Sequence, residues 1–191
     1  MRVGLLLALA LVAASVAAPA TAQTFENFKR FCLETGGEPE QVLAAAEAAG
    51  WDVYPGALVP TNLDLRLLGD PATGAPPVES LLTGFVPEQG ILAPVCTVAG
   101  GATLEDLRDR MSAWTGFEPG RTARGNSTWI YSAGAEGLAP HLDLVDVSGT
   151  ELIAAARSRG RLYAVQVRQG AGPPMIVHFS VNPDATISPT H

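Results

Sequence analysis

Residues 162–181 read LYAVQVRQGAGPPMIVHFSV, two apolar runs on either side of a turn rich in glycine and proline. Branched and aromatic side chains dominate both runs, Leu162–Arg168 and Met175–Val181, and this composition is typical of β-strands. The turn over Gln169–Pro174 reverses the chain between them. This stretch therefore predicts a pair of antiparallel strands.

The chain just before this pair has the same character. Three further short runs precede it: Thr128–Ser132, Leu142–Val147 and Glu151–Arg157. Turns that contain glycine separate them, so the last third of the chain is predicted to be an antiparallel meander. A short helix over Glu151–Ala156 is the alternative for the third run, because alanine favours helices.

The first half of the chain has helical periodicity instead. A helix is expected over about Phe25–Glu34, with aromatic side chains and Cys32 on one face, and a second over Pro39–Ala49, ended by Gly50. A third helix follows Thr103, which forms a capping-box variant with Asp106. Leu104, Leu107, Met111 and Trp114 lie along its apolar face.

Between the second and third helices the pattern is weaker, because six prolines interrupt residues 52–90. Alternating leucines predict a short strand over residues 63–67, and Gly69–Pro77 is expected to be a surface loop. Ile91–Val98 is interpreted as a buried strand that carries Cys96. The fold class is therefore α+β: N-terminal helices packed on a mostly antiparallel β-sheet, with a C-terminal meander.

The first 22 residues match a cleavable secretory signal peptide. Arg2 is followed by an uncharged run from Val3 to Ala18, and Ala20–Ala22 matches the A-x-A cleavage pattern. The run is too short for a membrane anchor, and no cysteine lies at the cleavage point to make a lipoprotein. Residues 23–181 are then expected to form a single globular domain, with a polar tail over residues 182–191 and no membrane span in the mature form.

Composition narrows the compartment and the partners. The mature chain has 11 basic and 19 acidic residues, so its acidic surface disfavours nucleic acid as a partner. Arginine outnumbers lysine eleven to one, and alanine and glycine are abundant, as in bacteria with GC-rich genomes. We expect a bacterial periplasmic or secreted protein.

Cys32 and Cys96 are the only cysteines. An even number in an oxidising compartment predicts one disulfide. A redox pair is the alternative, but the chain has no C-x-x-C motif. Two isolated cysteines without clustered histidines do not predict a metal site, and we expect no metal and no cofactor.

Few residues have the spacing of a catalytic or metal site. His141, next to the predicted strand over 142–147, and Asp143 within it would lie on the same face of an extended chain, where they could bind a metal or simply face solvent. His178 lies out of phase with Val177 and Phe179 and is interpreted as a polar-face or packing residue. The G-x-S-x-G motif of serine hydrolases is absent, so catalytic residues stay unassigned.

Arginines form two local groups on predicted loops, where they either bind an anion or are ordinary exposed side chains. They are Arg121 and Arg124 in one group and Arg157, Arg159 and Arg161 in the other.

Three function classes follow. The preferred one is a binding module for a small molecule or an envelope protein. The alternatives are a small periplasmic hydrolase that uses His141 or His178, and a structural envelope protein.

Overall fold

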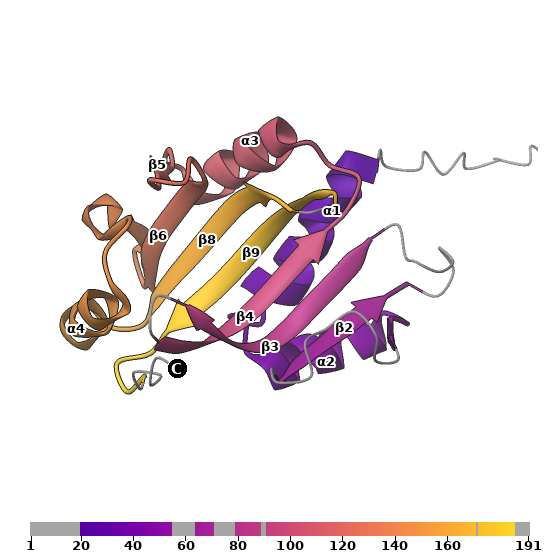
Figure 1. Ribbon diagram of the computed structural model, residues 1–191, viewed down its shortest axis with the longest axis horizontal. Helices are drawn as coiled ribbons and strands as arrows, with labels where there is room; N and C mark the ends of the chain where they lie inside the picture. Colours follow the sequence, from indigo (N-terminus) through magenta and orange to yellow (C-terminus); the bar gives the residue numbers. More distant parts are fainter. Residues whose placement is uncertain (1–19, 55–63, 71–78, 89–90, 171, 186–191) are drawn as a thin grey trace, which may run out of the picture.

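The computed structural model describes residues 20–54, 64–70, 79–88, 91–170 and 172–185. These residues form helices packed on a nine-stranded antiparallel sheet (Figure 1), so the predicted α+β fold is confirmed. The strand order is β1-β2-β3-β4-β9-β8-β6-β5, and β7 pairs with β6 alone. The strands are Asp52–Val53 (β1), Leu65–Gly69 (β2), Ser80–Glu88 (β3), Ile91–Ala99 (β4), Gly120–Arg121 (β5), Ser127–Gly134 (β6), Gly137–Pro140 (β7), Leu162–Gln169 (β8) and Pro174–Val181 (β9).

The predicted meander is confirmed in strands β6, β8 and β9, which are neighbours in the sheet. Leu162 pairs with Val181, and Gln169 pairs with Pro174 beside the turn. The first strand of this unit, β6, pairs with β8 from Ser127 to Tyr131. Strand β9 also pairs with β4, which joins the meander to the N-terminal half of the sheet.

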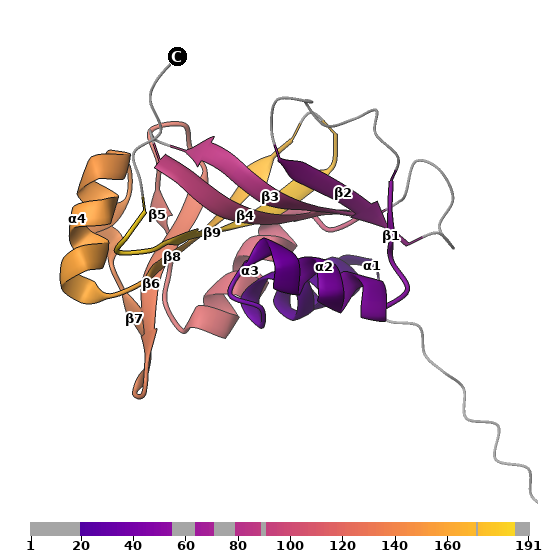
Figure 2. The ribbon, with the colours of Figure 1, turned by 90° about the horizontal axis from the view of Figure 1, so that it is seen from below.

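Helices α1 (Ala20–Phe28), α2 (Pro39–Ala48) and α3 (Leu104–Thr115) cover one face of the sheet (Figure 2). A single π-helical turn, η1 (Lys29–Leu33), continues α1. Thr103 caps α3 by accepting a hydrogen bond from the Asp106 amide, as its sequence predicts, and Gly116 ends the helix at φ 78°. The residues at its two ends therefore determine where α3 begins and where it ends.

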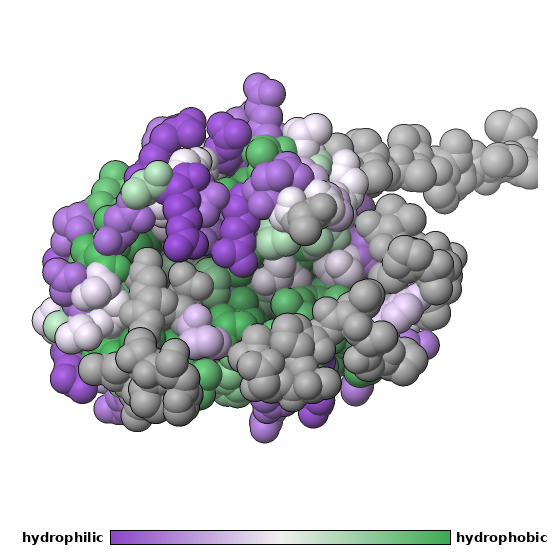
Figure 3. All heavy atoms as spheres, viewed as in Figure 1, coloured by the Kyte–Doolittle hydropathy of each residue, from purple (hydrophilic) through white to green (hydrophobic). Residues whose placement is uncertain are grey.

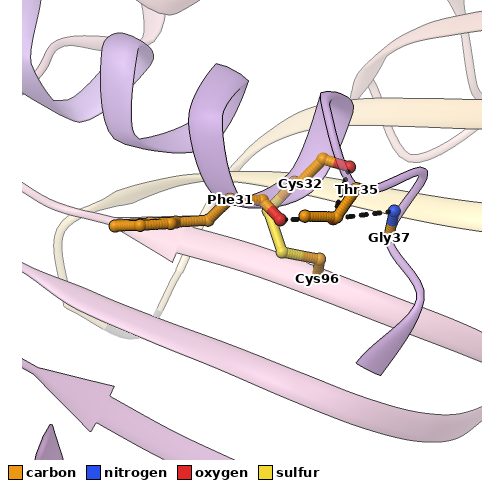
Figure 4. Close-up of a disulfide and its surroundings, with 5 residues drawn as sticks. All are labelled: Phe31, Cys32, Thr35, Gly37 and Cys96. Atoms are coloured by element: carbon orange, nitrogen blue, oxygen red, sulfur yellow. Dashed lines mark hydrogen bonds between the residues drawn. A yellow bond between two sulfur atoms is a disulfide. The ribbon is translucent and has the colours of Figure 1, made fainter. Parts of the chain in front are cut away.

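The core beneath these helices is built around Phe28, Phe31 and the disulfide between Cys32 and Cys96. All four side chains are fully buried. The Thr35 hydroxyl donates to the Phe31 carbonyl and accepts from the Gly37 amide, which fixes the turn after η1 (Figure 4). The predicted bridge between the first helix and the strand of Cys96 is therefore confirmed.

A second core lies on the opposite face of the sheet, under helix α4 (Gly149–Arg159). Leu152, Ile153 and Ala156 of α4 pack there against the ends of β4, β6 and β9. In the space-filling view of this face, apolar side chains gather in a hollow over the middle strands (Figure 3). The sheet is thus buried on both faces in the half that carries β8 and β9.

Two strand predictions are wrong. The run over 142–147 forms a 3₁₀ turn, η3 (Leu142–Leu144), because Asp146 adopts a left-handed φ of 67° and turns the chain. The run over 151–157 belongs to α4, as the helical alternative proposed, because Ser148 and Glu151 form a capping box.

In the segment 52–90 the observed strands also differ from the predicted ones. The short strand expected over 63–67 is observed as Leu65–Gly69. Strand β3 was not predicted, because Gly84 and Pro87 within it are usually strand breakers. The predicted loop Gly69–Pro77 lies mostly outside the described residues, as do residues 1–19 of the predicted leader and residues 186–191 of the predicted tail.

Candidate functional site

The helix layer does not reach the turn end of the β3–β4 hairpin, and a groove remains there on the helical face. Phe85 of β3 and Leu92 of β4 are 37% and 47% exposed, which is high for large apolar side chains. Phe85 pairs with Pro94, and Pro87 pairs with Leu92, so these side chains point to one face. Together they give the groove an apolar floor.

The walls of this groove come from the start of α2 and from the chain before β8 and after β9. Two adjoining hollows of about 470 and 650 Å³ share Glu38, Phe85, Arg161 and Asn182. Arg161 donates to Glu38 across the groove at 2.7 Å. Glu40 and Asp184 add two exposed carboxylates without an arginine or lysine to balance them among the lining residues. The groove therefore has a net charge of −2.

Ser180 lines the same groove from β9. Its side chain is 1% exposed, and its hydroxyl has no hydrogen-bond partner among the described residues. A buried hydroxyl without a partner costs about 1–3 kcal/mol, so such groups are rare in proteins. Its oxygen is itself buried, so Ser180 belongs to the wall of the groove rather than to its accessible surface.

A second polar cluster surrounds His141, near the C-terminal end of α4. The Ser132 hydroxyl lies 3.0 Å from His141 Nε2, and Arg159 Nη1 lies 3.3 Å from His141 Nδ1. Arg159 also donates to both carboxylate oxygens of Asp143, at 3.1 and 2.8 Å. His141 and Asp143 are thus brought together, although by a 3₁₀ turn and an arginine rather than by a shared strand face.

The Ser132–His141 pair has the spacing of a nucleophile and its base, but its hydrogen bonds run the wrong way. A guanidinium only donates, so Nδ1 of His141 must accept from Arg159. The proton of the neutral ring is then on Nε2, which donates to Ser132. In a serine hydrolase this nitrogen accepts the serine proton. With this tautomer the pair is the reverse of the serine–histidine arrangement in a hydrolase, and a catalytic role for His141 stays a prediction.

Substitution of Arg159 tests this assignment. Burial and the nearby guanidinium hold the pKa of His141 below its ordinary value, while Asp143 opposes them. We expect Arg159→Gln to raise the pKa of His141, since it removes the cation and leaves the carboxylate. The measurement is an NMR titration of the His141 ring. Arg157→Gln is the control because Arg157 donates to the Pro183 carbonyl instead. An unchanged pKa in Arg159→Gln, or a proton on Nδ1 of the wild-type ring, would contradict the assignment.

The predicted anion-binding arginines do not form one patch. Arg121 and Arg124 lie at the β5–β6 hairpin, next to the Ser127 end of β6. Arg159 and Arg161 lie near Leu162, at the other end of the β6–β8 ladder. Arg159 is paired with Asp143 and Arg161 with Glu38, so their charges are locally balanced. Their role in anion binding stays a prediction.

His178 is a packing residue in the first core rather than a surface base. It is fully buried, pairs with Cys96 across the β4–β9 ladder and stacks on Tyr163 with ring centroids 5.5 Å apart. Burial lowers its pKa to about 3. An imidazole that is buried and neutral has no access to a substrate, so the structure offers it no catalytic role.

Sequence reasoning missed the groove residues Phe85, Leu92 and Ser180. Phe85 lies in β3, which was not predicted, whereas Leu92 and Ser180 lie in predicted strands whose apolar runs indicate core positions. No local signal shows where the helix layer ends. Arg161 was singled out, but its pairing with Glu38, 123 positions away, depends on the tertiary fold.

No family model, curated protein or solved structure matches this chain. Within the described ranges no helix is long and apolar enough to cross a membrane. The same residues contain no group of three or more histidine, cysteine, aspartate or glutamate side chains placed to hold a metal ion. Exposed large apolar side chains distinguish the groove from a hollow of about 680 Å³ that Arg108 and Arg121 line beside α3.

Proposed function

We propose that this protein is an exported binding module whose groove holds an extended segment of a partner protein with alternating apolar and basic side chains. The observation that carries the proposal is the pair of exposed apolar side chains, Phe85 and Leu92, flanked by unbalanced carboxylates. Most exposed apolar residues on a protein are isolated, whereas a local cluster beside a hollow favours an interaction site.

Charge complementarity selects the partner. A groove with a net charge of −2, on a chain with a net charge of −7, attracts cations and repels anions. A basic side chain can contact Glu40 and Asp184 while a neighbouring apolar side chain lies on Phe85 and Leu92.

Export is part of the proposal. A buried disulfide is stable in an oxidising compartment, which fits the leader-like sequence Met1–Ala22. Helix α1 begins at Ala20, and the Gln23 side chain donates to Asn27 within it. Cleavage after Ala22 would keep this contact and most of α1. The partner is then expected to be another protein of the bacterial envelope or the medium.

A fluorescent peptide with alternating lysine and leucine residues tests the groove. We expect it to bind with a Kd of about 1–100 μM at low salt and to bind more weakly as salt rises, because exposed charges are screened. Leu92→Ser should weaken binding by about tenfold, as expected for the loss of more than 1 kcal/mol of apolar contact. The measurement is fluorescence anisotropy.

Leu142→Ser is the matched control, because Leu142 is 49% exposed but does not line the groove. It should bind the peptide like the wild type. The Glu40→Gln/Asp184→Asn double variant should lose most of the salt dependence, and a peptide with glutamate in place of lysine should not bind. Equal binding by the Leu92→Ser and Leu142→Ser variants, or no binding by the wild type, would reject the proposed function.

A further inference from the structure

A half-buried carboxylate lies beside the first turn of α1, where the mature chain is expected to start. It belongs to Glu79, which precedes β3, and the Asn27 side-chain amide donates to its Oε2 at 2.6 Å. Its other oxygen, Oε1, is buried without a hydrogen-bond partner among the described residues. A Cβ at Gly100 would lie 2.7 Å from Thr24 Oγ1 and 3.1 Å from this oxygen, so the glycine leaves room for both side chains.

The surroundings of this carboxylate disfavour its charged form. Burial raises the pKa of Glu79 above its ordinary value, although hydrogen bonds from Thr24 and Asn27 lower it. The negative charge of Asp70, just after β2, raises this pKa further. Among the described residues no arginine or lysine contributes to it. A positive group close to Glu79 would therefore stabilise the ionised carboxylate.

The expected start of the mature chain can supply this positive group. Thr24 and Asn27 are three positions apart on one face of α1, and side chains on a helix lean toward its N-terminal end. Because both bond Glu79, its carboxylate lies beside the turn that begins at Gln23. The backbone nitrogen of Gln23 is then within about one helical turn, 5.4 Å, of the carboxylate. The Gln23 side chain joins the same network by donating to Asn27 at 3.1 Å.

We propose that Glu79 binds the α-ammonium group that cleavage after Ala22 creates on Gln23. The inference rests on export, which is part of the proposed function, and is independent of the groove. In the precursor the same nitrogen belongs to a peptide bond and carries no charge, so the ion pair forms only in the mature protein. A free ammonium group at the start of a helix is unfavourable, because that end of the helix carries a partial positive charge. Glu79 offsets this charge and holds α1 on the sheet.

An NMR titration of the α-amine tests the ion pair directly. Lys29 is the only lysine, so reductive methylation with ¹³C-formaldehyde labels only the α-amine and the Lys29 side chain. We expect the pKa of the α-amine to rise from about 8 to about 9, as for a group beside an opposite charge. Glu79→Gln should restore a pKa of about 8. Glu26→Gln is the matched control, because Glu26 is exposed on the same turn of α1, and it should leave the pKa near 9. An α-amine pKa of about 8 in the wild type, or no difference between the wild type and Glu79→Gln, would overturn the proposal.

A longer form of the wild-type sequence tests the pair without a substitution, in case Glu79→Gln does not fold. A protein that starts at Ala20 keeps α1 and Glu79, but its amine lies three residues, about 4.5 Å, farther along the helix. Its α-amine should have a pKa of about 8, and equal pKa values in the two forms would overturn the proposal.

Mass spectrometry of the protein recovered from its native host separates this inference from the proposed function. A start at Gln23 with a free α-amine is expected. Cyclisation of Gln23 to pyroglutamate, in which the amine displaces ammonia from the side-chain amide, would remove the ammonium group. That result would overturn the ion pair and leave export and the groove unaffected. A retained leader would contradict export itself, and the ion pair with it.

Discussion

Replacement of both Cys32 and Cys96 by alanine is expected to lower the free energy of unfolding by about 4 kcal/mol. The bridge joins residues 64 positions apart, and a cross-link over a loop of this length removes much of the conformational freedom of the unfolded chain. Both sulfurs are buried in the first core, so the substitution also removes packing around Phe31. Few single contacts in the protein have an effect of this size.

Urea unfolding followed by circular dichroism measures this loss. A slope of about 2 kcal/mol per molar urea would place the midpoint about 2 M lower in the double variant. Wild-type protein unfolded with a reducing agent present loses the cross-link but keeps both thiols in the core. Its midpoint should therefore lie between those of the oxidised protein and the double variant, and its distance from the double variant measures the packing lost with the mutation itself. A loss of less than about 1 kcal/mol in both experiments would show that packing alone holds the helix layer on the sheet.

The parts of the fold that could be predicted are those encoded by neighbouring residues. Strands β8 and β9 have a turn between them, and α3 has a capping residue and a terminal glycine at the right spacing. The disulfide was predicted from the even number of cysteines and the expected oxidising compartment, and not from any geometric argument. In each case the signal lies within a short window or depends on only two residues, so the prediction needs no knowledge of the tertiary fold.

The errors arise where tertiary contacts reverse a local rule. Gly84 marks β3 as a break, yet the strand needs a glycine there because a Cβ would collide with the Asp64 carbonyl. The alternation around Asp143 imitates a strand, while the capping box of Ser148 and Glu151 was a usable helix signal that the strand interpretation overlooked. The groove could not be predicted, since it depends on where α2 begins relative to the β3–β4 hairpin.

Acid is expected to destabilise this protein through His178. The pKa of this imidazole is lowered from 6.5 to about 3, and burial is the only cause of the shift. Its Nδ1 has no hydrogen-bond partner among the described residues, and the Gly37 backbone packs so closely on it that a Cβ at Gly37 would collide with the ring. Among the described residues no carboxylate contributes to the pKa of this imidazole, so none of them stabilises its protonated form.

The sign of the effect follows from proton uptake. Between pH 6.5 and about 3 the unfolded chain holds a proton on this histidine and the folded chain does not. Stability is therefore fully present above pH 6.5 and falls as the pH drops, by up to about 1.4 kcal/mol per pH unit. By pH 3 the loss reaches about 5 kcal/mol, comparable with the total stability of many domains.

The expected result is a difference in slope between wild type and His178→Phe. The phenyl ring keeps the stacking on Tyr163 but cannot be protonated, so the variant should lose about 1.4 kcal/mol less per unit between pH 6 and pH 4. Urea unfolding at each pH measures the slope, which is independent of any constant change in packing, and His178→Leu provides a second neutral variant. His141→Gln is the control, because His141 lies in the partly exposed cluster with Arg159 and should alter the slope much less. Parallel pH profiles for wild type and both His178 variants would show that His178 is protonated in the folded protein, and would place the origin of acid unfolding in the carboxylates instead.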